Sequence, residues 1–275
     1  GASYYNGDMS IPSVLTKSLS DDEILELSKE KPPMEHSPFV VEMAGTNQPS
    51  LLIKTNGNYV LKRNSGAKTI FTVKNIDDPV EISGPWTVRF PPNAGVPPQI
   101  VLPQLMSLHE HEVASVRYFS GTAVYSTRFI FPGSLDNKLW FLDTGRVEVI
   151  AEISINGKNL GIVWKRPYTA NASGALIRGN NKIEIKVTTL WANRLIGDEQ
   201  LPDPDKFSGA GTIGLESVTK GNIEALPEWY SDGKPKPDNG RVCFTTWKHY
   251  KKDSPLLESG LMGPGLLFPA VIKPL

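Results

Sequence analysis

The 275-residue sequence has almost no cysteine and no excess of charge of either sign. Its single cysteine, Cys243, excludes an internal disulfide and a zinc site made of cysteines alone. The 29 basic and 29 acidic residues cancel, whereas a nucleic-acid or anionic-membrane surface requires a basic excess. No apolar run approaches the roughly 20 residues of a membrane-spanning helix. We therefore expect no nucleic-acid partner and no membrane partner.

Helical signals are also scarce. One helix is predicted in "LSDDEILELSKEKPP", where Ser20 is the N-cap, Glu23 completes a capping box and Pro32 ends the run. It lies in an irregular leader, residues 1–38, which we expect to be a tether or strap. The chain begins with Gly1 and not with methionine, which is compatible with removal of an export signal. We expect a periplasmic or extracellular location.

Turn and strand signals dominate the rest of the chain, which contains 24 glycines and 23 prolines. Residues 39–80 read as a small antiparallel β unit. In "LLIKTNGNYVLKRNSGAKTIFTV", three strands are joined at Asn56-Gly57 and at Asn64-Ser65-Gly66. Three strands alone are marginally stable, so this hairpin unit should pack on the next domain or belong to a β module further upstream.

Residues 81–275 form the main body, in which apolar and polar residues alternate with the period of half-buried strands. Clear examples are "TAVYSTRFIF", "RVEVIAEISI" with a type I′ turn at Asn156-Gly157, and "NKIEIKVTTLW". Two further strands are predicted in "RVCFTTWKHY" and "LLFPAVIKP", the latter at a sheet edge because it contains proline. The absence of helical crossovers predicts an all-β fold, an antiparallel jelly-roll β-sandwich.

Two predictions concern the packing of this main body. The strand beginning at Ile82, in "ISGPWTVRF", should pair with or lie beside the last strand near Phe268, because these are the outermost strand-like runs. Three tryptophans sit within strand patterns and should belong to the core, namely Trp86, Trp140 and Trp191.

A polar cluster follows one of the strands, in "TLWANRLIGDEQLPD". It opens a long connection rich in Gly, Pro, Asp and Ser, a kind of segment that is usually functional or a docking surface. One interpretation is a sugar-binding or catalytic loop, whose polar groups would be held in place without being buried. The other is a charged hydrogen bond between Arg194 and Asp198 that ties the loop down. The residue pattern favours the second, because Asp198 and Glu199 are adjacent and point apart on an extended chain. Glycoside hydrolysis normally needs two carboxyl groups about 5 to 10 Å apart.

Sugar binding requires exposed aromatic faces with planar polar side chains nearby. Each aromatic side chain in a loop has core packing as its alternative reading. The candidate ligand-binding residues are Trp164, Arg166, Asn193, Arg194, Asp198, Glu199, Trp247 and His249. Trp247 and His249 of "TWKHY" would lie on the same rim as the polar cluster if the two strand ends lie together.

Other chemistry is weakly indicated. His109 and His111 have a spacing that a zinc site could use, but no third ligand is evident, so we predict no metal and no cofactor. No nucleophile–base motif is visible, and Cys243 should be an inert packing residue. No catalytic residue is assigned.

The main body carries a family resemblance. "YFSGTAVYSTRFIF" followed by "VIAEISINGKNLGIVWKRPYTANASGALIRGNNKIEIKVTTLW" resembles the sugar-binding, galactose-binding-like jelly roll of family 2 glycoside hydrolases. "LWANRLIGDE" and "TTWKHYKKDSPLLESGLMGP" are more similar to the C-terminal region of bacterial α-L-rhamnosidase-like enzymes of glycoside hydrolase family 106. The likeness covers roughly residues 80 to 275.

The resemblance implies a particular function. In those enzymes the acid and base carboxylates lie in a separate barrel, and nothing in this sequence has the alternation of strands and helices that a barrel shows. We therefore expect a non-catalytic accessory β-sandwich of a bacterial glycoside hydrolase, which binds a plant or host glycan or packs on a catalytic barrel of the same parent chain. The alternative is a free-standing secreted carbohydrate-binding protein. In either case, the chain alone should not hydrolyse aryl glycosides, including rhamnosides.

Overall fold

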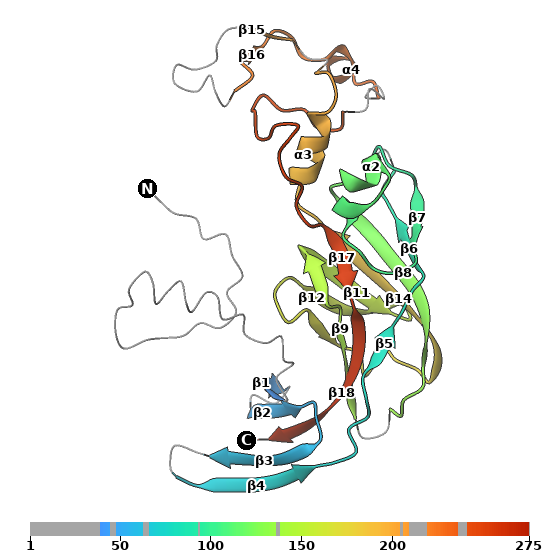
Figure 1. Ribbon diagram of the computed structural model, residues 1–275, viewed down its shortest axis with the longest axis vertical. Helices are drawn as coiled ribbons and strands as arrows, with labels where there is room; N and C mark the ends of the chain where they lie inside the picture. Colours follow the sequence, from blue (N-terminus) through green and yellow to red (C-terminus); the bar gives the residue numbers. More distant parts are fainter. Residues whose placement is uncertain are drawn as a thin grey trace.

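The computed structural model describes residues 39–44, 48–62, 66–92, 94–135, 138–203, 206–208, 219–235 and 241–274. The helix predicted in the leader lies outside these residues. The described chain is elongated, with a β-sandwich in the middle and a hairpin near the C-terminus at one end (Figure 1). Helix α3 lies towards the other end, where β15, β16 and α4 are outermost. Among the described residues, no helix is long and apolar enough to cross a membrane.

Two six-stranded sheets form the sandwich. The first has the order β12-β11-β14-β8-β6-β7, with bounds Lys158–Val163, Ile150–Ile155, Gly179–Thr188, Thr122–Phe131, Trp86–Arg89 and Gln99–Leu102. The second has the order β1-β2-β18-β9-β13 with β5 also on β18, and its bounds are Phe39–Ala44, Gln48–Ile53, Gly265–Pro274, Leu139–Asp143, Thr169–Asn171 and Val80–Ile82. Every strand pair in both sheets is antiparallel. The predicted all-β antiparallel sandwich is confirmed.

Smaller elements surround the two sheets. A ribbon of β10 (Arg146–Glu148) and β17 (Gly260–Gly263) bridges them. The short helices η1 (Leu108–Glu110) and α2 (Ala114–Arg117) precede β8. Helix α3 (Ala192–Asp198), the ribbon β15–β16 (Phe207–Ser208 and Asn222–Ile223) and α4 (Glu228–Ser231) follow β14.

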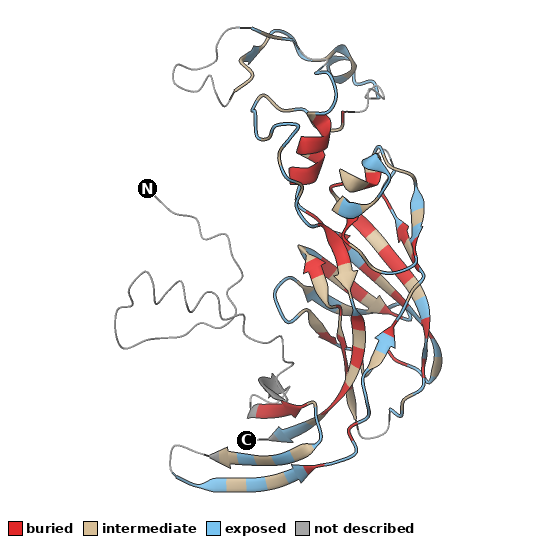
Figure 2. Ribbon diagram, in the orientation of Figure 1, coloured by how far each residue is buried: buried red, intermediate tan, exposed pale blue. Residues whose placement is uncertain are grey.

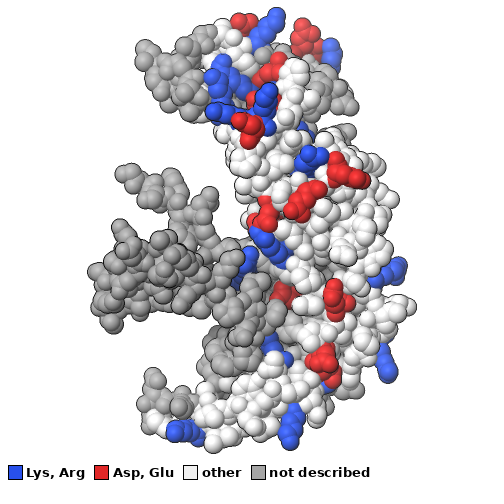
Figure 3. Space-filling model, viewed as in Figure 1, with Lys and Arg blue, Asp and Glu red and all other residues white. Residues whose placement is uncertain are grey.

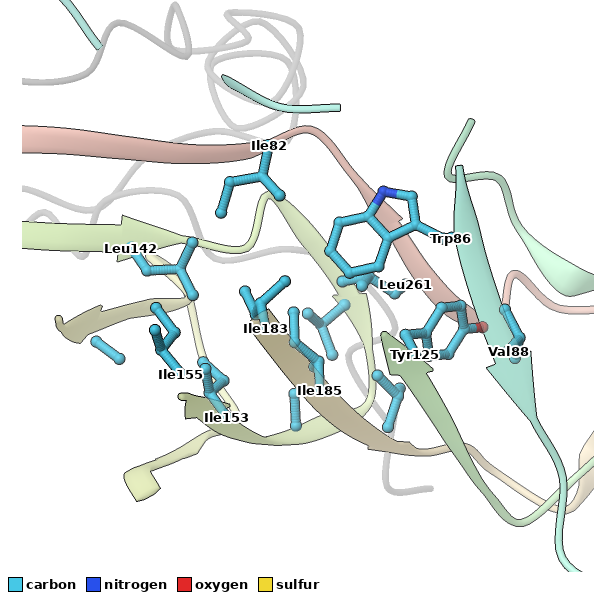
Figure 4. Packing of buried hydrophobic residues seen from close by; sticks show 14 of the residues in the cluster. Ile82, Trp86, Val88, Tyr125, Leu142, Ile153, Ile155, Ile183, Ile185 and Leu261 are labelled. Carbon is cyan, nitrogen blue, oxygen red and sulfur yellow. The ribbon is translucent and has the colours of Figure 1, made fainter. Parts of the chain in front are cut away.

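Side chains from both sheets fill the core. Figure 4 shows Ile82 and Leu142 of the second sheet facing Ile153, Ile183 and Ile185 of the first. The alternation read from the sequence produces this layer, because inward residues of β8, β11 and β14 are buried while their neighbours are more exposed. The type I′ turn predicted between β11 and β12 is confirmed by positive φ angles at Asn156 and Gly157.

The last strand, β18, lies in the interior of its sheet, so its predicted edge position is wrong. It pairs with β9 over Leu266–Ala270, with β5 over Gly265–Leu267 and with β2 over Val271–Pro274. Pro269 falls between the stretches that pair with β5 and with β2. Proline has no N–H group to donate to a neighbouring strand. It is tolerated at position 269 because no described strand pairs with residues 268–270 on the side of β18 that β5 and β2 occupy.

The predicted closure by the strand that begins at Ile82 is wrong, because the "GPWTVRF" run and the last strand lie in different sheets, although Ile82 itself contacts the last strand. Ile82 of β5 pairs with Gly265 of β18. The "GPWTVRF" stretch does not follow it, because Trp86–Arg89 forms β6 in the opposite sheet, between β8 and β7. The chain therefore crosses from one sheet to the other between Ile82 and Trp86.

The hairpin unit differs from its predicted form in one respect. β3 (Gly57–Lys62) and β4 (Lys68–Val73) form the expected hairpin, whose turn residues 63–65 lie outside the described chain. β2 does not pair with β3. It lies between β1 and β18, so the second sheet includes strands from residues 39–80 and from the main body.

Two other expectations from strand alternation are wrong. Residues 241–250 form no strand, because the backbone N–H groups of Val242 and Cys243 donate to the Asp198 carboxylate and not to a neighbouring strand. Trp191 is 53% exposed, whereas Trp86 and Trp140 are buried as predicted. β14 ends at Thr188, so the alternation no longer decides which way Trp191 points.

Asn181 holds the turn before β14 together and supplies the first testable prediction. Its side chain is buried, donates to the carbonyls of Ile177 and Gly179, and accepts from the Ile177 N–H and from Asn156 Nδ2. Asn181→Ala should lower the free energy of unfolding by about 2 to 3 kcal/mol, because it leaves several buried polar groups without partners. Urea unfolding would measure this. The exposed neighbour Asn180 is the control, and Asn180→Ala should change stability by less than about 0.5 kcal/mol.

Candidate functional site

The polar cluster after β14 forms a short helix and not a loop. α3 begins with Ala192, directly after the exposed Trp191, and ends at Asp198. It is buried on most sides, as the red ribbon of Figure 2 shows. A Cβ atom on Gly197 would lie 2.6 Å from the Cβ atom of Tyr118. Glycine is therefore needed in α3 because the helix packs closely against the segment before β8.

Arg194 and Asp198 form the predicted ion pair. Arg194 Nη2 lies 2.9 Å from Asp198 Oδ1, one helical turn away, and the side chains are only 7% and 3% exposed. Asp198 also accepts two backbone hydrogen bonds, from Val242 N at 3.0 Å and from Cys243 N at 2.7 Å. One carboxylate therefore joins α3 to a segment more than forty residues further along the chain.

A second set of ion pairs, centred on Arg241, also joins the end of α3 to the segment that begins at residue 241. Arg241 Nη2 donates to Glu199 Oε1 at 2.7 Å, and Arg241 Nη1 lies 3.5 Å from Asp203 Oδ2. Lys220 Nζ donates to the same Asp203 oxygen at 2.5 Å. Arg194, Lys220 and Arg241 are thus matched in number by Asp198, Glu199 and Asp203, so the charges of the network balance.

Asn193 and Gln200 connect α3 to the far end of the same segment. Asn193 Nδ2 donates to the Leu257 carbonyl, and its Oδ1 accepts from the Leu257 N–H. Gln200 Nε2 donates to the Lys252 carbonyl. Residues 241–257 are therefore held at both ends by side chains in or just after α3.

These contacts correct one expectation. The cluster was predicted to present its polar groups without burial, but Asn193, Arg194 and Asp198 are 2%, 5% and 2% exposed. On an extended chain these groups would face solvent, whereas helix α3 turns them towards residues 241–257.

The segment that α3 holds exposes an aromatic and basic stretch, residues 245–252, which we call the basic loop. Trp247 is 46% exposed, and Lys248, His249, Lys251 and Lys252 are exposed as well. Thr219 forms an antiparallel bridge with Trp247, and Lys220 N donates to the Thr246 carbonyl. The expected neighbourhood of "TWKHY" and the polar cluster is therefore observed, although through a loop and not through a strand end.

Trp164 and Arg166 lie elsewhere, in the connection between β12 and β13. Trp164 directly follows β12 and is 64% exposed, with Lys165 Nζ 5.8 Å from its ring centre. Arg166 is also exposed. The predicted site residues therefore come from two parts of the chain, the β12–β13 connection and the region of α3 and the basic loop.

Sequence reasoning missed a buried serine–histidine pair. Ser107 Oγ lies 2.6 Å from His109 Nδ1 and accepts a hydrogen bond from Ser259 N. Ser107 is buried, and within the described residues His109 has no carboxylate partner. The pair therefore joins η1 to the start of β17. Ser107 and Ser259 are 152 residues apart, so no local signal could have indicated the hydrogen bond between them.

The histidines of the described residues do not form a metal site. His111 Nδ1 accepts from Val113 N, as His109 Nδ1 contacts Ser107. In the part of the chain that the structure describes, no three His, Cys, Asp or Glu residues could hold a metal ion together.

Comparison with known proteins provides one related sequence. The sequence matches no protein-family model. It is 38% identical over 212 residues to a protein of Formosa agariphila named "Putative beta-glucuronidase". The match covers 76% of this chain but only 17% of that protein.

Among solved structures, one shares the fold of most of this chain. A rhamnosidase from Novosphingobium sp. PP1Y superimposes with a TM-score of 0.54 and 22% identity, over 84% of this chain and 24% of the enzyme. A β-D-glucuronidase of Dictyoglomus thermophilum gives a TM-score of 0.43 and 17% identity, over 72% of this chain and 29% of that one. The sequence match relates the chain to part of a protein named as a glycoside hydrolase, and the rhamnosidase shows a shared fold. The chain's assignment to family 2 or family 106, and to a C-terminal position, remains a prediction.

Proposed function

We propose that this chain is a non-catalytic, carbohydrate-contacting β-sandwich of a bacterial glycoside hydrolase. The observation that carries the proposal is the 212-residue match to a protein named as a β-glucuronidase, of which it covers 17%. The described residues form an all-β sandwich, and a segment of a rhamnosidase shares this fold. We propose that the acid and base carboxylates belong to another part of the parent protein.

The carboxylates of Asp198 and Glu199 already have partners within the protein, which supports a non-catalytic role. Asp198 is buried and accepts bonds from Arg194, Val242 and Cys243, while Glu199 accepts from Arg241. A catalytic acid or base must reach the proton of a bound substrate. Asp198 would have to break a buried ion pair to do so. We propose that Asn193, Arg194, Asp198 and Glu199 act as positioning residues for the basic loop.

Two exposed aromatic groups remain as candidate sugar contacts. Trp247 and His249 lie on the basic loop, and Trp164 and Arg166 lie in the β12–β13 connection. An exposed indole face can stack on the C–H groups of a sugar, and neighbouring polar side chains can orient the hydroxyls. We propose the basic loop as the main contact, because its backbone is held by α3. No observation specifically favours a free-standing binding protein.

The proposal predicts binding without turnover. The purified chain should not hydrolyse aryl glucuronides or aryl rhamnosides, because under this proposal the acid and base carboxylates belong to another part of the parent protein. It should bind at least one polysaccharide in affinity electrophoresis, and Trp247→Ala should weaken that binding about fivefold. Val242→Ala, in the same segment, is the control and should leave binding unchanged. Turnover abolished by a single carboxylate substitution would refute the non-catalytic assignment.

A further inference from the structure

The charge of the basic loop is distributed differently from that of the rest of the chain. Residues 245–252, "TTWKHYKK", contain three lysines and one histidine and no carboxylate, although the whole chain has no net charge. Figure 3 shows Lys and Arg side chains, with Asp and Glu side chains among them, at the end of the molecule where α3 lies in Figure 1. Asp253, directly after the loop, is the nearest acidic residue in sequence.

Three carboxylates in or just after α3 are already paired with other cations. Asp198 is paired with Arg194, Glu199 with Arg241, and Asp203 with Lys220. No ion pair of Lys251 or Lys252 is recorded within the described residues. Lys251 and Lys252 therefore add positive charge to a loop that also carries the exposed indole of Trp247.

The loop is also held in place before any ligand arrives. Its backbone is bonded to Lys220 at Thr246 and to Gln200 at Lys252, and the flanking residues are bonded to Asp198 and Asn193. A binding surface ordered in advance loses less conformational entropy when a ligand binds. A solvated charged loop with no binding role would not need this number of anchors.

From this arrangement we propose that the basic loop binds an anionic glycan, through lysine contacts to carboxylate or sulfate groups and stacking of a sugar ring on Trp247. This inference rests on the proposed carbohydrate-binding function and specifies its ligand class. The lysines supply charge, and the indole supplies the apolar face that distinguishes a sugar from a simple anion. Binding should weaken as ionic strength rises, because exposed charges are screened by salt.

The test compares four polymers with the full 275-residue chain by affinity electrophoresis and calorimetry, at low and at high ionic strength. They are a polygalacturonate, a sulfated galactan, the unsulfated galactan and poly-L-glutamate. Binding to the first or the second is expected, and the difference between these two identifies carboxylate or sulfate as the preferred group. The neutral galactan should bind more weakly.

Two double variants locate the site. Lys251→Gln/Lys252→Gln should weaken anionic-glycan binding about three- to tenfold, which is the range for two exposed ionic contacts. Lys68→Gln/Lys74→Gln makes the same charge change at the exposed β4 end of the molecule and should have no effect. Circular dichroism would verify that all variants are folded.

The remaining outcomes each contradict the inference. If the neutral galactan bound as tightly as the anionic glycans, the anionic ligand class would be wrong and the proposed carbohydrate-binding function would stand. If poly-L-glutamate bound as tightly as the anionic glycans, the loop would bind polyanions in general and would not be specific for a glycan. Anionic-glycan binding that the Lys251/Lys252 variant leaves unchanged would place the site elsewhere. The absence of any carbohydrate binding would overturn the inference and the proposed function together.

Discussion

Asp198→Asn is expected to lower the free energy of unfolding by about 3 to 5 kcal/mol, the range observed when one partner of a buried ion pair is removed. The substitution leaves the buried guanidinium of Arg194 without its counter-charge. It also replaces one of the carboxylate oxygens that accept from Val242 N and Cys243 N with an amide group that donates. Arg194 Nε already has no hydrogen-bond partner among the described residues, so this arginine has little alternative pairing.

Asp232→Asn is the matched control for this experiment. Asp232 forms an ion pair with Lys234 at 2.7 Å, but the two side chains are 48% and 68% exposed. Exposed pairs contribute little because water and salt screen them, so this variant should change stability by less than about 1 kcal/mol. Guanidinium unfolding monitored by tryptophan fluorescence would measure both variants. Equal effects for the two would mean that the Arg194–Asp198 pair does not act as a buried one.

Asp198→Asn also distinguishes the two interpretations of the polar cluster, a structural ion pair and a ligand-binding loop. If α3 positions the basic loop, Asp198→Asn should increase hydrogen exchange at the amides of Val242 and Cys243, whose acceptor is altered. A residue that contacted only a ligand would leave these amides unchanged in the free protein.

The sandwich could be predicted from the sequence because its signals are local. The alternating burial of β8, β11 and β14, and the Asn156-Gly157 turn, depend on the period of two and on dipeptide preference. The pairing of Arg194 with Asp198 was also predictable, since it involves residues four positions apart.

The errors share one cause, which is that distant contacts decide the local structure. "RVCFTTWKHY" has strand-like alternation, but Asp198 takes the N–H groups of Val242 and Cys243, so no strand forms there. The segment from Trp191 onward becomes a helix that packs against Tyr118, in which Arg194 N donates to Ser120 Oγ. Nothing within a window of ten or twenty residues contains these partners.

The second large effect is expected at Gly260, the first residue of β17. Gly260 has a φ of +90°, a value that favours glycine because a Cβ atom would be strained there. A Cβ atom would also lie well inside contact distance of Tyr125 Oη and 3.1 Å from Leu108 Cγ. Tyr125 and Leu108 are fully buried in the core, so neither can move into solvent to make room. Gly260→Ala should therefore lower the free energy of unfolding by about 3 kcal/mol or more.

The backbone and packing parts of this effect can be separated. Gly157 has a φ of +80°, and a Cβ atom added to it would meet no other atom within 4 Å, so Gly157→Ala should cost only about 1 to 2 kcal/mol. Burial raises the pKa of Tyr125, whose hydroxyl lies near the Leu261 backbone without a well-formed hydrogen bond to any described residue. Tyr125→Phe alone should thus change stability by about 1 kcal/mol or less.

The double variant Tyr125→Phe/Gly260→Ala should be more stable than the sum of its single variants predicts, because removing the hydroxyl frees the space that the new methyl group needs. A coupling free energy of about 1 to 3 kcal/mol is expected for groups in direct contact. Urea unfolding of the four proteins in the cycle would measure it. Strict additivity would mean that the cost at Gly260 comes from its positive φ, and that the close approach of β17 to Tyr125 contributes nothing.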